Sequence, residues 1–90
     1  MNASSRLLDR AKVAKHLTSD YGLAKALGWS RSFVSNLRAG ERVLSDEGAE
    51  QLAEFGNFPL ALALAELHAE KAKTPASRAA WTEIAERLAA

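Results

Sequence analysis

Alanine and leucine dominate the apolar residues of this chain, and β-branched residues are scarce. The 90 residues include 19 alanines and 13 leucines, but valine, isoleucine and threonine together supply only seven. Strands depend on β-branched and aromatic side chains, whereas alanine and leucine are among the strongest helix formers. The composition therefore predicts an all-α domain and argues against a β-sandwich or a β-barrel.

Length and residue types also limit where the chain acts and what chemistry it performs. A domain of 90 residues buries only about 60–65% of its unfolded surface, so we expect help from a second copy. The lack of cysteine excludes disulfides, thiol nucleophiles and cysteine-based zinc sites. The N-terminus has no apolar signal core, and the longest apolar run, residues 60–65, is far short of the ~20 residues of a membrane span. We therefore expect a soluble, cytoplasmic protein with no membrane partner.

Capping residues and glycines divide the chain into six predicted helices. Serine, threonine and asparagine are good N-cap residues, and glycine is suited to helix ends. Caps are expected at Thr18 or Ser19, Ser30, Ser45, Asn57 and Thr74, and helix ends at Gly28, Gly40 and Gly56. Both prolines, Pro59 and Pro75, stand in the first turn of a predicted helix. The predicted helices span residues 5–17, 20–27, 31–39, 46–55, 58–73 and 75–89.

Charges are unevenly distributed along the sequence. Residues 1–45 carry eight basic and three acidic side chains, a net charge of +5. Residues 46–90 carry four basic and eight acidic side chains, a net charge of −4. A basic half favours a polyanionic partner, with an unevenly charged solvated surface as the alternative.

One stretch, residues 20–39, has the spacing of a helix-turn-helix unit. Ala24 is small enough for a second helix to cross against it, and Gly28, four residues later, permits a tight turn. Apolar residues on both sides of that turn would form a wedge that fixes the angle between the helices. The predicted core of the unit consists of Leu23, Ala24, Leu27, Gly28, Trp29, Val34 and Leu37.

This stretch resembles the DNA-binding domain of the Cro- and cI-type phage repressors and their bacterial relatives. The resemblance covers roughly residues 5–65 and includes the sequence RSFVSNLRAGER over residues 31–42. It implies a five- to six-helix bundle of the lambda-repressor-like DNA-binding type. Residues 1–57 would form the DNA-binding bundle, and residues 58–90 would pack in the same compact domain. It also implies a phage- or prophage-encoded protein of the bacterial cell that regulates transcription, most simply as a repressor.

In this architecture the recognition helix enters the major groove of double-stranded DNA with its N-terminal residues on base edges. Rotation by ~100° per residue turns Val34 and Leu37 inward and the polar residues outward. Arginine pairs with guanine, asparagine with adenine, and serine with either. The predicted readout residues are Arg31, Ser32, Ser35 and Asn36, and the predicted phosphate contacts are Tyr21, Lys25, Arg38 and Arg42.

Two residues near this surface have alternative roles. Many members of the family carry glutamine where this chain has Asp20, and that glutamine helps to grip the DNA backbone. A carboxylate would repel phosphate, so the alternative role of Asp20 is to cap the helix that follows. Phe33 lies about 100° off the buried wedge and is either half-buried or in contact with a thymine methyl group.

The C-terminal helices predict association of two copies. Members of the family bind palindromic half-sites as dimers, with the half-sites about one helical turn apart. An apolar stripe on the last helix packs either on the preceding helix or on a second copy. The residues of this surface are Leu60, Leu64, Leu67, Trp81, Ile84 and Leu88. We expect a homodimer, and the alternative function is an antitoxin-like or other protein-interaction module that uses the acidic C-terminal helices.

The sequence does not predict catalysis or metal binding. It lacks a Ser-His-Asp order, a paired-carboxylate signature and a glycine-rich phosphate loop. Glu66 and Glu70 share one helix face, whereas His68 lies about 200° around the helix, which is unsuited to a metal site. We expect no enzymatic activity, no cofactor and no metal.

Overall fold

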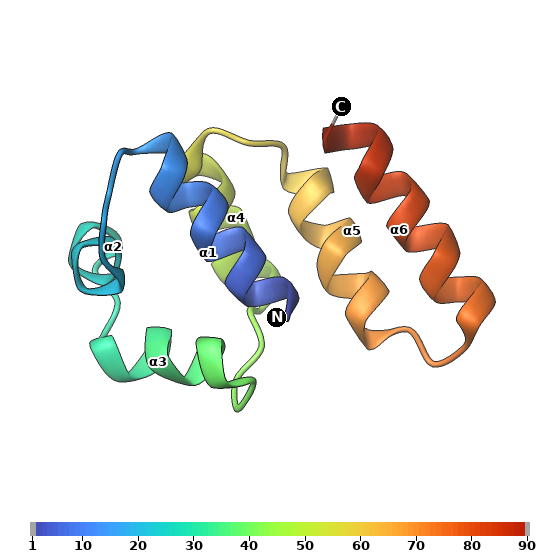
Figure 1. Ribbon diagram of the computed structural model, residues 1–90, viewed down its shortest axis with the longest axis horizontal. Helices are drawn as coiled ribbons and strands as arrows, with labels where there is room; N and C mark the ends of the chain where they lie inside the picture. The colour runs from blue at the N-terminus through green and yellow to red at the C-terminus, as the bar shows by residue number, and fades with distance from the viewer. Residues whose placement is uncertain (1, 90) are drawn as a thin grey trace.

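A computed structural model describes residues 2–89, which form six helices and no strand. The helices are α1 (Ala3–Ala14), α2 (Asp20–Leu27), α3 (Arg31–Ala39), α4 (Asp46–Gly56), α5 (Leu60–Lys71) and α6 (Pro75–Ala89) (Figure 1). The prediction of an all-α chain is thus confirmed. No helix within residues 2–89 has both the length and the apolar character needed to cross a membrane.

Local capping chemistry sets the ends of α2 and α3 and the start of α4, as predicted. The hydroxyl groups of Ser19, Ser30 and Ser45 each accept a hydrogen bond from the amide three residues later, at 3.0–3.1 Å. Gly28 and Gly40 end α2 and α3 with positive φ angles of 73° and 81°. Glycine adopts this left-handed conformation without the steric cost that a Cβ atom brings.

The first helix begins two residues and ends three residues earlier than predicted. Asn2 caps α1, because its Oδ1 accepts a hydrogen bond from the amide of Ser5 at 2.8 Å. The helix ends at Ala14, and His16 then takes a positive φ of 57°. The predicted span of residues 5–17 is therefore wrong at both ends.

The junction between α4 and α5 also differs from the prediction. Gly56 is still helical, and Asn57 takes the left-handed conformation at φ 55° that ends α4. Asn57 is therefore the C-cap of α4 and not the N-cap of the next helix. Helix α5 begins at Leu60, after Pro59, without a side-chain cap.

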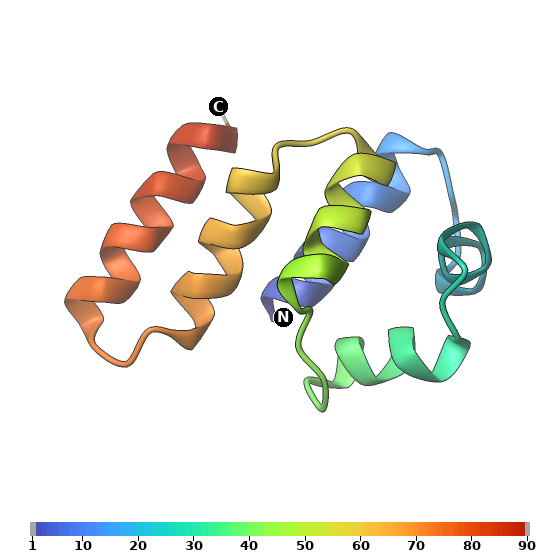
Figure 2. The same cartoon turned by 180° about the vertical axis from the view of Figure 1, so that it is seen from behind.

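The six helices form a central pair with two further helices on each side. Helices α1 and α4 lie side by side in the middle, α2 and α3 lie to one side, and α5 and α6 to the other (Figures 1 and 2). The main core draws on α1 to α5 and on the loop before α4. Its buried residues are Ala3, Leu7, Leu8, Ala11, Leu23, Ala24, Leu27, Val34, Leu37, Leu44, Ala49, Leu52, Ala63 and Leu67.

Helix α6 lies at the edge of the molecule and packs against α5 alone among the helices of residues 2–89. Ala85 is the one residue of α6 that is buried in the described part of the chain. It contacts a small second cluster with Leu62 and Ala65, on which Phe58 also packs. Helix α6 is thus held by one helix and a thin apolar contact.

Candidate nucleic-acid interface

Helices α2 and α3 form the compact unit that the spacing of residues 20–39 predicts. The amide of Trp29 donates to the carbonyl of Ala24 at 2.9 Å, which closes the turn after Gly28. Five residues of the predicted core of the unit are buried, namely Leu23, Ala24, Leu27, Val34 and Leu37. Trp29 is only half-buried and packs against the rim of this core.

A side chain of α4 clamps the turn between α2 and α3. Gln51 accepts a hydrogen bond from the indole N–H of Trp29 at 3.1 Å. Its amide nitrogen donates to the carbonyl of Leu27 at 2.8 Å. Gln51 therefore contacts both the last residue of α2 and Trp29 in the turn that leads to α3. Its place in the sequence, on a different helix, gave no signal of this role.

The outer face of α3 lines an open groove of about 540 Å³. The side chains of Arg31, Ser32 and Ser35 are exposed there, and Asn36 is half-buried. Tyr21 and Asp20, at the start of α2, form the opposite side of the groove. The structure thus brings all four predicted readout residues to one concave surface.

Tyr21 and Arg31 contact each other across the mouth of this groove. The guanidinium of Arg31 lies 5.0 Å from the centre of the Tyr21 ring, within the range of a cation–π contact. Tyr21 is 56% exposed, and Arg31 is exposed as well. The contact holds the cation near the N-terminal end of α3.

Phe33 is half-buried, which is one of the two alternatives that the sequence predicts for it. Its ring packs edge-on against Trp29, with the ring centres 5.1 Å apart. The guanidinium of Arg42 lies 5.5 Å above the Phe33 ring. The contact with a thymine methyl group stays a prediction.

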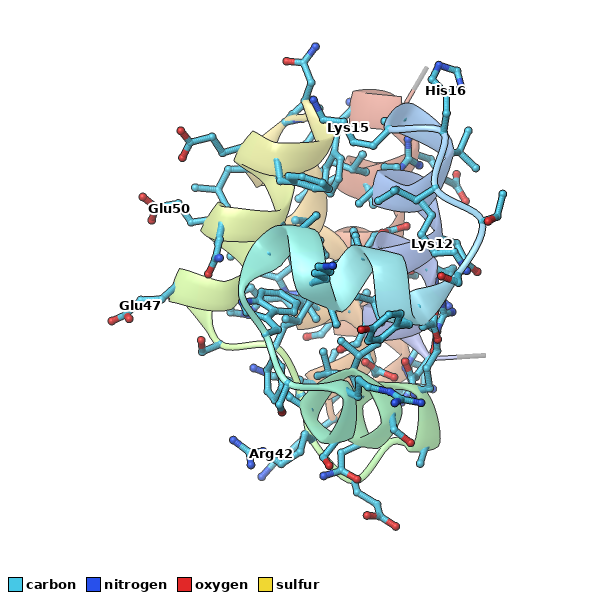
Figure 3. The ribbon with its side chains drawn as sticks, turned by 90° about the vertical axis from the view of Figure 1, so that its left-hand side faces the viewer. Lys12, Lys15, His16, Arg42, Glu47 and Glu50 are labelled. Atoms are coloured by element: carbon cyan, nitrogen blue, oxygen red, sulfur yellow. The ribbon has the colours of Figure 1, made fainter. Side chains whose placement is uncertain are left out.

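Basic and acidic side chains separate at this end of the molecule. Arg42 projects at the foot of α3, whereas Glu47 and Glu50 point outward from α4 (Figure 3). Lys25 and Arg42 are exposed cations, available to a partner in solution. The acidic face of α4 therefore bounds the region that an anionic ligand would favour.

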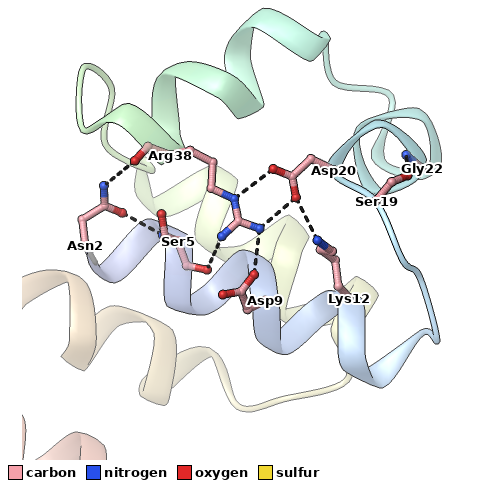
Figure 4. A network of polar contacts seen from close by, with 8 residues as sticks. All are labelled: Asn2, Ser5, Asp9, Lys12, Ser19, Asp20, Gly22 and Arg38. Atoms are coloured by element: carbon pink, nitrogen blue, oxygen red, sulfur yellow. Dashed lines mark hydrogen bonds and ion pairs between the residues drawn. The ribbon is translucent and has the colours of Figure 1, made fainter.

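Arg38 has a different environment from the one predicted for a phosphate contact. Its Nε donates to Asp20 Oδ2 at 3.0 Å, and its Nη2 donates to Asp20 Oδ1 at 2.8 Å and to Asp9 Oδ1 at 2.7 Å (Figure 4). Its Nη1 donates to the carbonyl of Ser5 at 3.3 Å. All three guanidinium nitrogens are therefore engaged within the chain, and the side chain joins α3 to α1 and α2.

Asp20 is the anion at the centre of this network. Besides Arg38, it accepts a hydrogen bond from Lys12 Nζ at 3.1 Å. The hydrogen bond from the Arg38 guanidinium lowers the pKa of Asp20, and the same contact raises the pKa of Arg38. Ser19, and not Asp20, caps α2. The predicted capping role of Asp20 is therefore wrong.

Some residues of the predicted C-terminal surface are buried in the core, and others are exposed to solvent. Leu67 is buried in the main core and Leu64 packs against it. Trp81 stacks on His68 of α5, with ring centres 4.9 Å apart. The side chains that stay exposed by 37–42% are Leu60, Trp81, Ile84 and Leu88.

The acidic residues of α5 have contacts that belong to the fold. Glu70 accepts a hydrogen bond from the amide of Ala3 at 3.2 Å, which ties α5 to the start of α1. Glu66 forms an ion pair with Arg6 at 3.8 Å. These carboxylates and His68 therefore lie against three different partners.

Comparison with known proteins gives one match. A family model described as "Phage related protein" matches residues 64–90, which cover the last eight residues of α5 and all of α6. Searches of curated proteins and of solved structures return no match. The chain is thus similar to a phage-related family over its C-terminal hairpin, outside the groove beside α3.

Proposed function

We propose that this chain is a sequence-specific, DNA-binding transcriptional regulator of phage type, most simply a repressor. The observation that carries the proposal is the groove beside α3, where Arg31, Ser32, Ser35 and Asn36 meet on one exposed surface. A buried wedge and the Gln51 clamp hold this surface in a fixed orientation. Rigid presentation of a polar helix face is what direct readout of base edges requires.

In the proposed complex, α3 lies in the major groove of double-stranded DNA. Arg31 is placed to bind guanine with two hydrogen bonds, and Asn36 to bind adenine, with the two serines as supporting contacts. Tyr21, Lys25 and Arg42 surround this face and supply contacts to phosphate. Occupation of an operator would then block access of RNA polymerase to the promoter.

We further propose that two copies bind DNA together, through the C-terminal hairpin. Helix α6 has one packing partner in the described chain and leaves Trp81, Ile84 and Leu88 partly exposed. A two-fold pair would present one copy of α3 to each half-site of a palindrome. The match to a phage-related family falls on this same hairpin.

Selection of bound duplexes from a random pool, at physiological salt, tests the proposed function. The expected result is enrichment of a two-fold symmetric site with half-site centres about one turn apart. Retention that is sensitive to salt but enriches no sequence would indicate a charge-driven, non-specific binder. No retention at all would contradict DNA binding.

The second candidate function is a protein-interaction module, and the exposed stripe of α6 favours it. An apolar helix face rimmed by Glu83, Glu86 and Arg87 has the composition of a surface that binds another protein. In that case the hairpin, and not α3, would hold the partner. Loss of DNA retention together with capture of a specific protein through α6 would support this function instead.

A further inference from the structure

The carboxylate of Asp20 stands at the edge of the groove beside α3, where the proposed function requires DNA phosphate to approach. Asp20 is the first residue of α2 and lines the groove together with Tyr21 and Arg31. Its side chain is 39% exposed, so the carboxylate is partly accessible at the surface of the groove. An anion at this position repels a phosphate that enters the groove.

Two cations beside the groove are held by this carboxylate. Arg38 also lines the groove, but its Nε and Nη2 both donate to Asp20, at 3.0 and 2.8 Å. Lys12, on α1, donates to Asp20 Oδ1 at 3.1 Å. Both cations are largely enclosed, with side-chain exposures of 24% and 20%. Asp20 therefore withholds from DNA two positive charges that would strengthen its contact with phosphate (Figure 4).

Capping does not account for an acid at this position, and Asp20 shares the pairing of Arg38 with a second acid. The cap of α2 is Ser19, whose hydroxyl accepts the hydrogen bond from the amide of Gly22. A second acid, Asp9 of α1, already pairs with Arg38 Nη2 at 2.7 Å. Asp9 does not line the groove, so it neutralises the arginine without facing an incoming phosphate.

We propose that Asp20 is a specificity-determining residue, which weakens the phosphate-driven, non-specific part of DNA binding. The inference rests on the proposed function. Phosphate contacts supply essentially all of non-specific affinity, whereas base contacts supply discrimination. The Asp20 carboxylate opposes phosphate and keeps Arg38 and Lys12 paired, so it lowers the affinity that comes from phosphate contacts. It leaves the discrimination that comes from base contacts unchanged. The chain would thus spend less time on random DNA relative to its operator.

Binding of three variants to a labelled random-sequence duplex, measured by fluorescence anisotropy over a range of salt concentrations, tests this inference. Asp20→Asn removes the charge at the groove. Asp9→Asn removes the same charge from the same network but away from the groove, and so matches the change in net charge. Asp20→Glu keeps the charge at the groove. Thermal unfolding followed by circular dichroism checks that each variant is folded.

Asp20→Asn is expected to bind the random duplex about fivefold more tightly than the wild type, with a salt dependence steeper by about one phosphate contact. Asp9→Asn should change this affinity by less than about twofold. Asp9 does not line the groove, and its replacement leaves Arg38 and Lys12 paired with Asp20. Asp20→Glu should bind as the wild type does. If Asp20→Asn does not fold, the other two variants still test the inference. Tighter binding of the random duplex by Asp9→Asn than by Asp20→Glu would contradict it, because removal of a charge away from the groove would then be sufficient.

The outcomes separate this inference from the proposed function. Equal affinity gains in Asp20→Asn and Asp9→Asn would show an effect of net charge alone and would overturn the role of Asp20. Weaker binding by a folded Asp20→Asn would also overturn it. If the wild type binds neither random nor selected duplexes, the proposed function fails and this inference fails with it.

Discussion

At the scale of single residues, Arg31 and Arg38 differ in whether their charge is available to an anionic partner. Both arginines lie on α3 and both border the groove. Arg31 is exposed beside Tyr21, whereas Arg38 is held by Asp20, Asp9 and the carbonyl of Ser5. An excess of basic residues in the sequence therefore overstates the number of cations that an anionic partner meets.

Arg31 and Arg42 are expected to contribute differently to DNA binding. Replacement of Arg31 by alanine should cost about 1–3 kcal/mol on the selected duplex and little on a random duplex, because a base contact is lost. Replacement of Arg42 by alanine should weaken both complexes alike, because a phosphate contact is lost. Anisotropy titrations of both variants against both duplexes measure this difference. Equal losses on the two duplexes for Arg31→Ala would contradict its role in readout.

The Asp20 network predicts a loss of stability in acid. The pKa of Asp20 is lowered in the folded chain by the hydrogen bond from Arg38, relative to about 3.9 in the unfolded chain. Its contribution to the free energy of unfolding is therefore complete above the unfolded pKa and disappears as the pH falls through the lower folded value. Because the side chain is 39% exposed, we expect a contribution of only about 1 kcal/mol. Urea unfolding at neutral and acidic pH should show a smaller loss in acid for Asp20→Asn than for the wild type.

At the scale of helices, local turn chemistry is predictable from sequence and contacts between helices are not. Ser19, Ser30 and Ser45 cap their helices because each acts on an amide three residues away. The predicted bounds of α2 and α3 are therefore confirmed. The start of α1 differs from the prediction although Asn2 caps it by the same local bond, and Asn2 also has a distant partner. Its Nδ2 donates to the carbonyl of Leu37, at the end of α3, at 3.0 Å.

The groove residues illustrate the same division. The helical period places Arg31, Ser32 and Ser35 on the outer face of α3, and they are exposed there. The period carries no information on the partners of Arg38, because Asp9 and Asp20 are 29 and 18 residues away in the sequence. The clamp by Gln51 is equally non-local, 22 and 24 residues from its two partners.

Gly56 is predicted to be required for close packing and not for a turn. A Cβ atom at this position would lie 2.7 Å from the ring of Phe58 and 3.1 Å from the Cα of Ala11. The backbone of α1 has little freedom to move away, so Gly56→Ala should destabilise the chain by about 1–2 kcal/mol despite its better helix propensity. Asn57→Gly is the matched control. It keeps the left-handed conformation and should change stability by less than about 0.5 kcal/mol in urea unfolding. An increase in stability for Gly56→Ala would contradict this account of packing.

At the scale of the whole molecule, the proposed DNA surface and the proposed dimer surface lie on opposite sides of the α1–α4 pair (Figures 1 and 2). Charge differs between the two sides: residues 20–39 carry three basic side chains against one acidic, whereas the four basic and four acidic side chains of residues 60–89 cancel. The positive side favours approach to DNA through α3. The C-terminal hairpin then remains available to a second copy.

Ile84 provides the test of the proposed dimer. It is 42% exposed, so Ile84→Glu should leave the fold intact while it places a charge in the apolar surface between copies. We expect this variant to sediment as a monomer at tens of micromolar, where the wild type sediments as a dimer, and to lose affinity for the palindromic site. Ala79→Glu, about 140° away around α6, is the matched control and should remain dimeric. A wild-type chain that sediments as a monomer under these conditions would contradict the proposed dimer.

The central claim is that α3 and the start of α2 form the surface that binds DNA. Mapping of backbone amide chemical shifts of the wild-type chain, on titration with the selected duplex, tests it most directly. The largest shifts are expected on residues 31–36 and on Asp20 and Tyr21, with smaller changes at Lys25 and Arg42. Shifts concentrated on α5 and α6, with α3 unchanged, would contradict it.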